Sequence, residues 1–331
     1  MSVFVQQQHS VCDFTGSDSW VILSEIEQSI KRKIEAVGTP LKDWDIQINY
    51  GIKTGYNDAF IITTEKRDEI LAKCITDEER QRTAELIRPI LRGRDIKRYG
   101  YEWANLWLIA TFPARQYDIN NYPAVKNYLL SFAKQKLIDA GYSWVANDHL
   151  ADFCKQKLSQ TGKFIEIDGK RITLRNSQEK ARKKTSNKWF ETQDSISYWE
   201  DFSKPKIVFQ EIVQEGQFTL DTIEHFMCND TCRIIVGNDI SFLIGILNSK
   251  LFFFAIKTYY GGGGLGEHAV RMKHTFFGLF HCIRVDDMIL SLVHNRLITN
   301  DVSIERKINN RIYELYNLSK EEILFIENSH D

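Results

Sequence analysis

Cationic side chains gather between residues 84 and 111 and give the first indication of chemistry in this sequence. The members from 88 onward are Arg88, Arg92, Arg94, Lys97 and Arg98, with Asp95 as the only acid among them. The aromatic residues that follow at near-alternate positions are Tyr99, Tyr101, Trp103 and Trp107. Basic side chains interleaved with aromatic ones suit a surface that binds a phosphate backbone and reaches for bases. The alternative is a solvated charged loop whose aromatic residues lie in the core.

Two other patterns could hold a metal ion. Glu166-x-Asp168-x-Lys170 has the spacing of a metal-dependent nuclease strand, but Asp168-Gly169 also predicts the tight turn of a plain hairpin, which we favour. His225, Cys228 and Cys232 lack a second ligand pair at tight spacing, so buried thiols are expected there instead of zinc. We therefore predict no metal site.

Catalytic and cofactor motifs are missing from the sequence. The glycine run 261–266 matches G-x-G-x-x-G, but it follows a predicted helix and lacks the acidic residue of a dinucleotide site. Base methylation on an exocyclic nitrogen typically uses an Asn/Asp-Pro-Pro-Tyr/Phe loop, and the chain has 5 prolines and no Pro-Pro pair. We predict no catalytic residue and no cofactor in this chain.

Composition is that of a folded protein without a global charge bias. The chain has 331 residues, of which 43% are hydrophobic and 26% charged, and its net charge is −1. Any nucleic-acid affinity must therefore come from local patches. The 6 scattered cysteines predict reduced thiols, and no secretory signal precedes them, so a cytoplasmic location is expected. The apolar window 241–260 is broken at Asn248, Ser249 and Lys250, which favours a core helix and no membrane contact.

The predicted elements alternate between strands and helices. Ser24-x-x-Glu27 and Ser319-x-x-Glu322 are capping boxes that begin helices, and a glycine turn from Gly51 to Gly55 joins two β-rich pieces within 46–64. A helix capped by Asp77 is expected to lead into an apolar helical turn at 86–91. Further expected elements are a strand at 106–110, a hairpin at 163–174, strands within 204–236, one helix at 240–257, and two helices at the C-terminal end. This pattern predicts an α+β fold, a mixed β-rich domain with a helical C-terminal part.

The sequence also suggests two parts. Residues 1–235 are predicted to form a recognition region with a variable basic insert at about 124–187, and residues 236–331 a core helix, a glycine loop and C-terminal helices.

Four blocks resemble a known family: INYGIKTGYNDAFII (48–62), IRPILRGRDIKRYGYEWANLWLI (87–109), KWFETQDSISYWEDFSKPKIVFQEI (188–212) and LIGILNSKLFFFAIK with its glycine loop and Arg271 (243–271). They are similar to the TaqI-like C-terminal specificity domain. This domain is the target-recognition part of N6-adenine DNA methyltransferases and type II (IIG-like) restriction–modification enzymes.

The resemblance implies sequence-specific recognition of double-stranded DNA opposite a methyltransferase domain that binds S-adenosylmethionine. That domain is not recognisable in this sequence, so no catalysis is expected from the chain alone. The alternatives are a stand-alone specificity subunit that docks a separate methyltransferase through its C-terminal helices, and, third, the nuclease. The DNA-contacting residues that the resemblance nominates are Lys53, Thr54, Tyr56, Asn57, Arg92, Arg94, Lys97, Arg98, Lys183, Lys184 and Arg271.

Overall fold

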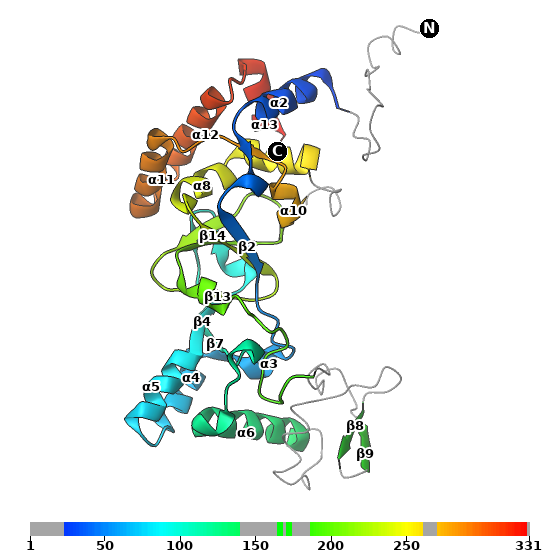
Figure 1. The fold of residues 1–331 in the computed structure, drawn as a ribbon, viewed down its shortest axis with the longest axis vertical. Helices are drawn as coiled ribbons and strands as arrows, with labels where there is room; N and C mark the ends of the chain where they lie inside the picture. The colour runs from blue at the N-terminus through cyan, green and yellow to red at the C-terminus, as the bar shows by residue number, and fades with distance from the viewer. Residues whose placement is uncertain (1–22, 140–163, 168–169, 174–185, 261–269, 330–331) are drawn as a thin grey trace.

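A four-stranded antiparallel sheet forms the middle of the molecule (Figure 1). The computed structural model describes residues 23–139, 164–167, 170–173, 186–260 and 270–329. The strands lie in the order β12-β10-β14-β2, and every neighbouring pair is antiparallel. Their bounds are β2 (Ile46–Tyr50), β10 (Lys206–Gln210), β12 (Phe218–Asp221) and β14 (Cys232–Gly237).

Both faces of this sheet are buried, each in its own hydrophobic core. Ile207 and Phe209 of β10 point into one core, and Val208 between them points into the other, because side chains alternate along a strand. Ile235 and Ile234 of β14 divide in the same way. The central sheet therefore separates the two cores and contributes side chains to both.

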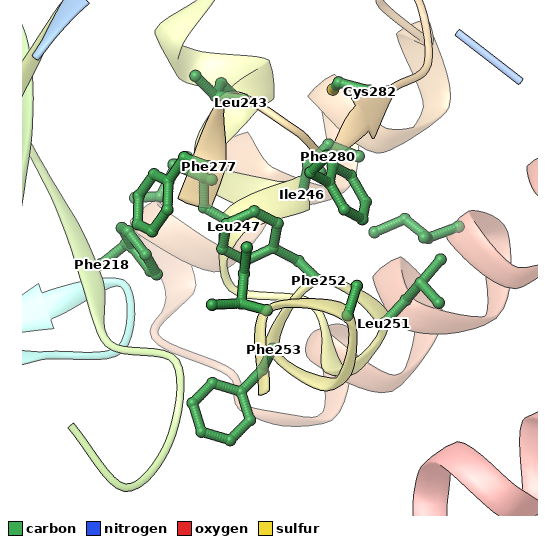
Figure 2. Close-up of a cluster of buried hydrophobic side chains, with 14 of the residues drawn as sticks. Phe218, Leu243, Ile246, Leu247, Leu251, Phe252, Phe253, Phe277, Phe280 and Cys282 are labelled. Atoms are coloured by element: carbon green, nitrogen blue, oxygen red, sulfur yellow. The ribbon is translucent and has the colours of Figure 1, made fainter. Parts of the chain in front are cut away.

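The first core is completed by helices (Figure 1). Figure 2 shows its centre, where Phe252 meets Phe277 and Phe280 at ring-centroid distances of 5.2 and 5.1 Å. Edge-to-face rings of this kind add to the energy of burial. The helices are α2 (Glu25–Ala36), α8 (Ile240–Leu247), α9 (Lys250–Ala255), a π-helical turn (Ile256–Tyr260), α10 (His274–Phe277), α11 (Asp287–Thr299), α12 (Ser303–Leu315) and α13 (Lys320–Asn328).

The second core lies between the central sheet and a second sheet in the order β13-β4-β7-β3. The strands are β3 (Ile61–Thr63), β4 (Ile87–Leu91), β7 (Leu106–Ile109) and β13 (Met227–Cys228), and β13 runs parallel to β4. The surrounding helices are α3 (Asn57–Phe60), α4 (Thr64–Ala72), α5 (Asp77–Leu86) and α6 (Pro123–Asp139). The remaining described strands form two-stranded pieces: β1 (Thr39–Pro40) with β16 (His281–Cys282), β5 (Ile96–Lys97) with β6 (Gly100–Tyr101), β8 (Phe164–Ile167) with β9 (Lys170–Thr173), and β11 (Ile212–Val213) with β15 (Val270–Arg271).

The α+β prediction is confirmed, as are both capping boxes and the hairpin, in which Ile167 pairs with Lys170. The apolar turn at 86–91 was predicted as helix, and this is wrong: α5 ends at Leu86, and β4 follows because it pairs with β7 and β13. The second β-rich piece within 46–64 begins as helix α3. Thr76, not Asp77, caps α5. The division at 235/236 stays a prediction.

The single helix expected at 240–257 is two helices, bent by 63° at Asn248 and Ser249. The buried Asn248 amide accepts a hydrogen bond from the Phe218 backbone N–H and donates one to the Phe218 carbonyl, at 3.0 and 2.9 Å. Ser249 caps the N-terminus of α9, where its side chain accepts a hydrogen bond from the Phe252 N–H. No single helix in the described ranges is long and apolar enough to cross a membrane. The bent pair has that length and apolar character only when its two helices are taken together. The C-terminal end has three helices, α11 to α13, where two were expected.

Gly245 provides a test of the packing between α8 and α11. A Cβ atom at this position would lie 2.7 Å from Cγ2 of Val293 and 3.2 Å from Cγ2 of Ile289. We expect Gly245→Val to lower the free energy of unfolding in urea by about 3 kcal/mol through overpacking. In the Gly245→Val variant, Val293→Ala should lower the unfolding free energy by less than it does in the unmodified chain, because the smaller side chain makes room for the new valine.

The matched control is Ser241→Val, one turn earlier on α8 at an exposed position. It should change the unfolding free energy by no more than about 0.5 kcal/mol. Equal urea midpoints for Gly245→Val and the unmodified chain would contradict this account of the packing.

Candidate nucleic-acid interface

Segments 50–54, 91–95 and 229–232 meet at one end of the two sheets. The Gly51 N–H donates to the Cys232 carbonyl at 2.9 Å, and the Asn229 N–H donates to the Leu91 carbonyl at 3.1 Å. Gly51 is required by this approach, because a Cβ there would lie 1.9 Å from the Asn229 carbonyl oxygen. The turn around Gly51 and the turn at 92–95 therefore share one surface.

The turn at 92–95 is fixed by Arg92 and Asp95. The Asp95 carboxylate accepts hydrogen bonds from Nε and Nη2 of Arg92, at 3.0 and 2.7 Å, and from the Arg92 backbone N–H at 2.9 Å. This bidentate pairing raises the pKa of the Arg92 guanidinium above its usual value. Arg92 is thus a structural part of the turn.

Arg94 projects from the tip of this turn. It is exposed, and within the described part of the chain it has no ion-pair partner. Gly93 beside it donates its N–H to Oγ1 of Thr231 at 3.3 Å, which holds the tip against the neighbouring segment. Arg94 is therefore presented to solvent from a rigid base.

Two further cations of the stretch, Lys97 and Arg98, are engaged. Nζ of Lys97 lies 3.4 Å from Glu102 and donates to the Arg94 carbonyl at 3.3 Å. Nε of Arg98 lies 2.5 Å from Glu305 on α12, and Nη1 donates to the Gly216 carbonyl. The same Glu305 carboxylate accepts from Arg296 of α11 at 2.9 Å. Arg98 thus links the basic stretch to the helical part.

The glycine turn exposes Lys53, whereas the residues that follow Lys53 are hydrogen-bonded to one another. Lys53 is exposed, whereas Thr54 is buried and donates its hydroxyl to Oδ1 of Asn57 at 2.6 Å. Oγ1 of Thr54 also accepts the Tyr56 N–H at 3.1 Å, and Tyr56 packs against the second core. Asn57 is exposed, but the oxygen that would contact adenine is already hydrogen-bonded.

A second group of charges, which the sequence reasoning found only in part, surrounds Glu211. Nε of the predicted Arg271 lies 4.0 Å from the Glu211 carboxylate, and Nη2 of Arg233 lies 3.0 Å from it. Arg233 was not predicted. Its guanidinium carbon lies 4.0 Å from the ring centroid of Tyr50, its partner across the β14–β2 pair. The sequence feature that could have identified Arg233 is a charged residue within the apolar run of β14.

Tyr50, Glu211 and Arg233 line an open depression with a volume of about 650 Å³. The other side is formed by residues 193–198, including Tyr198, whose hydroxyl donates to the Tyr50 carbonyl at 3.1 Å. Burial raises the pKa of Tyr198 to about 12, so this hydroxyl keeps its proton at neutral pH. The depression adjoins Lys53, which is part of its lining.

Three residues considered from the sequence lie outside the described residues: Lys183 and Lys184 of the nominated DNA contacts, and Asp168 of the nuclease alternative. No group of three potential metal ligands occurs among the described residues. Cys74, Cys228, Cys232 and Cys282 are free and buried, and burial raises the pKa of the Cys228 and Cys282 thiols.

A family model described as the TaqI-like C-terminal specificity domain matches residues 88–265. The chain belongs to this family. The match begins in β4 and includes the turn at 92–95, Glu211 and Arg233. No curated protein matches the sequence.

Two solved structures match this chain. One is a type IIL restriction–modification enzyme, MmeI, solved in complex with DNA; it has 11% sequence identity and a TM-score of 0.51, and the match covers 95% of this chain and 37% of that one. The other is the type IIG restriction endonuclease BpuSI, with 12% identity, a TM-score of 0.48, and coverage of 88% and 32%. This chain thus spans well under half the length of either protein.

The two arginines Arg94 and Arg98 of this specificity domain should behave differently. We expect Arg98→Met to lower the free energy of unfolding in urea by about 2 kcal/mol, because it leaves part-buried Glu305 and Arg296 without a balanced set of hydrogen bonds. Arg94→Met should leave the urea midpoint unchanged, because exposed unpaired side chains add little to stability. A loss of stability at Arg94 equal to that at Arg98 would contradict this assignment.

Proposed function

We propose that this chain recognises a specific sequence in double-stranded DNA as the specificity domain of a restriction–modification enzyme. The observation that carries the proposal is Arg94, exposed on a rigid turn within the family match and close to the segment that carries Lys53. Exposed cations without internal partners are available to neutralise phosphates, and arginine can also contact guanine through two hydrogen bonds.

The roles within this surface follow from what each side chain already binds. Arg94 is assigned to base or phosphate contact, and Lys53 to phosphate contact. Arg92 is assigned to holding the turn and Arg98 to anchoring it, because their guanidinium groups are engaged with Asp95 and Glu305. Arg271, 41% exposed, is assigned to the edge of the surface.

Methylation is assigned to a methyltransferase domain or subunit that adjoins this one. S-adenosylmethionine would be bound there and supplies the methyl group. The present sequence does not fit that role, because it has no Pro-Pro pair and therefore no Asn/Asp-Pro-Pro-Tyr/Phe loop to hold a target base.

Selection from a randomised duplex pool tests the DNA proposal. We expect one motif to be enriched, with an affinity that falls as the salt concentration rises. Arg94→Ala should weaken binding to that motif by about 10-fold or more, equivalent to roughly 1–3 kcal/mol for a base contact. If Arg94 contacts a base, the variant should also relax one position of the motif.

The control is Arg80→Ala on α5, an exposed arginine outside the proposed surface. It should bind like the unmodified chain. Equal weakening by both substitutions would point to a general charge effect, and no duplex binding at low salt would overturn the proposed function.

A second surface favours an additional role, that of docking the methyltransferase. A groove of about 1010 Å³ lies between α11 and the segment 219–224, and its lining includes Ile223 and Ile298, which are 79% and 68% exposed. Acidic Glu224 and Asp287 line it too, and no lysine or arginine is among its described lining residues. Apolar and acidic surface of this kind suits a protein partner with a basic rim, not DNA.

This groove, and not the last two helices, is the part of the C-terminal region that we assign to docking. Ile308, Ile312 and Ile326 of α12 and α13 are buried in the first core, so removing those helices would unfold the chain. We expect Ile298→Asp to abolish co-purification with a co-expressed methyltransferase subunit, while Leu324→Asp, at an exposed position on α13, should not. Undiminished co-purification of the Ile298 variant would contradict the docking site.

A further inference from the structure

The depression beside Tyr50 contains an arginine whose hydrogen bonding is incomplete. Arg233 is only 4% exposed, yet among the described residues its Nε and Nη1 atoms have no hydrogen-bond partner. Nη2 alone is engaged, with Glu211. Buried polar groups are nearly always satisfied, so an arginine left in this state calls for a missing partner.

Tyr50 covers this arginine and is itself half exposed, at 52%. It is the last residue of β2, where the strand ends and the chain turns at Gly51. Rotation of its side chain about the Cα–Cβ bond would uncover the guanidinium. The aromatic ring would then stand at the wall of the depression.

The lining of the depression identifies the chemistry of the missing partner. Arg233 and Lys53 supply donors, whereas Glu211, Asp230 and Asp194 supply carboxylate acceptors. A phosphate would be repelled by three carboxylates. A nucleobase is planar, stacks on an aromatic ring, and carries both acceptors and donors on its edge, so it matches this set. A volume of about 650 Å³ also admits one nucleotide.

We propose that this depression accepts one unpaired base of the bound DNA, stacked on Tyr50 and contacted at its edge by Arg233 and Glu211. The inference rests on the proposed DNA-binding function and adds a site to it. Lys53 at the rim is placed to contact the phosphate of the same nucleotide. Tyr50 has two roles, covering Arg233 when no DNA is bound and stacking on the base when it is.

A single-base bulge tests the proposal, because the cost of unpairing the base has then already been met. The full chain is titrated by fluorescence anisotropy with a fully paired duplex, the same duplex with one bulged nucleotide, and a third with an abasic bulge. We expect the bulged duplex to bind at least tenfold more tightly than the other two. The abasic bulge bends the duplex similarly but presents no base, so it separates base recognition from bending.

Tyr50→Leu should remove the preference for the bulged base, and Tyr50→Phe should keep it, because the phenyl ring still stacks. Tyr101→Leu is the matched control, an exposed tyrosine in the groove beside α11, and it should also keep the preference. Thermal unfolding of each variant confirms that it is folded.

Each outcome decides between the two proposals. Salt-sensitive binding of the paired duplex with no preference for the bulged base would overturn the inference and leave the DNA-binding function standing. A preference that survives Tyr50→Leu, or that extends equally to the abasic bulge, would also overturn it. Failure to bind any of the duplexes would overturn both.

Discussion

Burial of the central sheet on both faces is the constraint on which the rest of the structure depends. Strands β10 and β14 contribute Ile207 and Ile235 to one core and Val208 and Ile234 to the other. Two layers that share a wall cannot shift independently, because each change on one face moves side chains on the other. The segments that leave the ends of this sheet are held at fixed positions, and the proposed DNA surface is built from those segments.

Ion pairs inside the protein hold these segments in place. Lys206 is fully buried and donates to Asp221 at 2.6 Å, and Asp221 also accepts the N–H groups of His225 and Phe226. This fixes the connection from β12 to β13 against β10. Arg98 acts similarly between the basic stretch and α12. Of the described cations in the basic stretch and the glycine turn, Arg94 and Lys53 are the exposed ones without an ion pair.

Two kinds of surface are separated on this scaffold. The surface around Arg94, Lys53 and the depression at Tyr50 is polar and mixed in charge, as expected for contacts with phosphates and base edges. The groove beside α11 is apolar and acidic. The two proposed sites therefore differ in charge, because Arg94 and Lys53 supply cations to the first and Glu224 and Asp287 supply carboxylates to the second.

The sequence by itself determined the α+β class, both capping boxes, the hairpin and the family, because these depend on local spacing and on contiguous motifs. It also nominated Arg94 and Lys53, which remain exposed. Only the tertiary structure decided that Arg92 and Arg98 are structural, that residues 87–91 form a strand, and that the helix at 240 breaks at Asn248. For Arg98, residues 87–91 and Asn248 the partner is distant in sequence, namely Glu305, β7 and Phe218. Arg92 pairs locally with Asp95, and the structure was needed to show that pairing. Arg233 was missed because its contacts are with Tyr50 on the neighbouring strand and with Glu211, both distant in sequence; the charge within the apolar run of β14 was its only local signal.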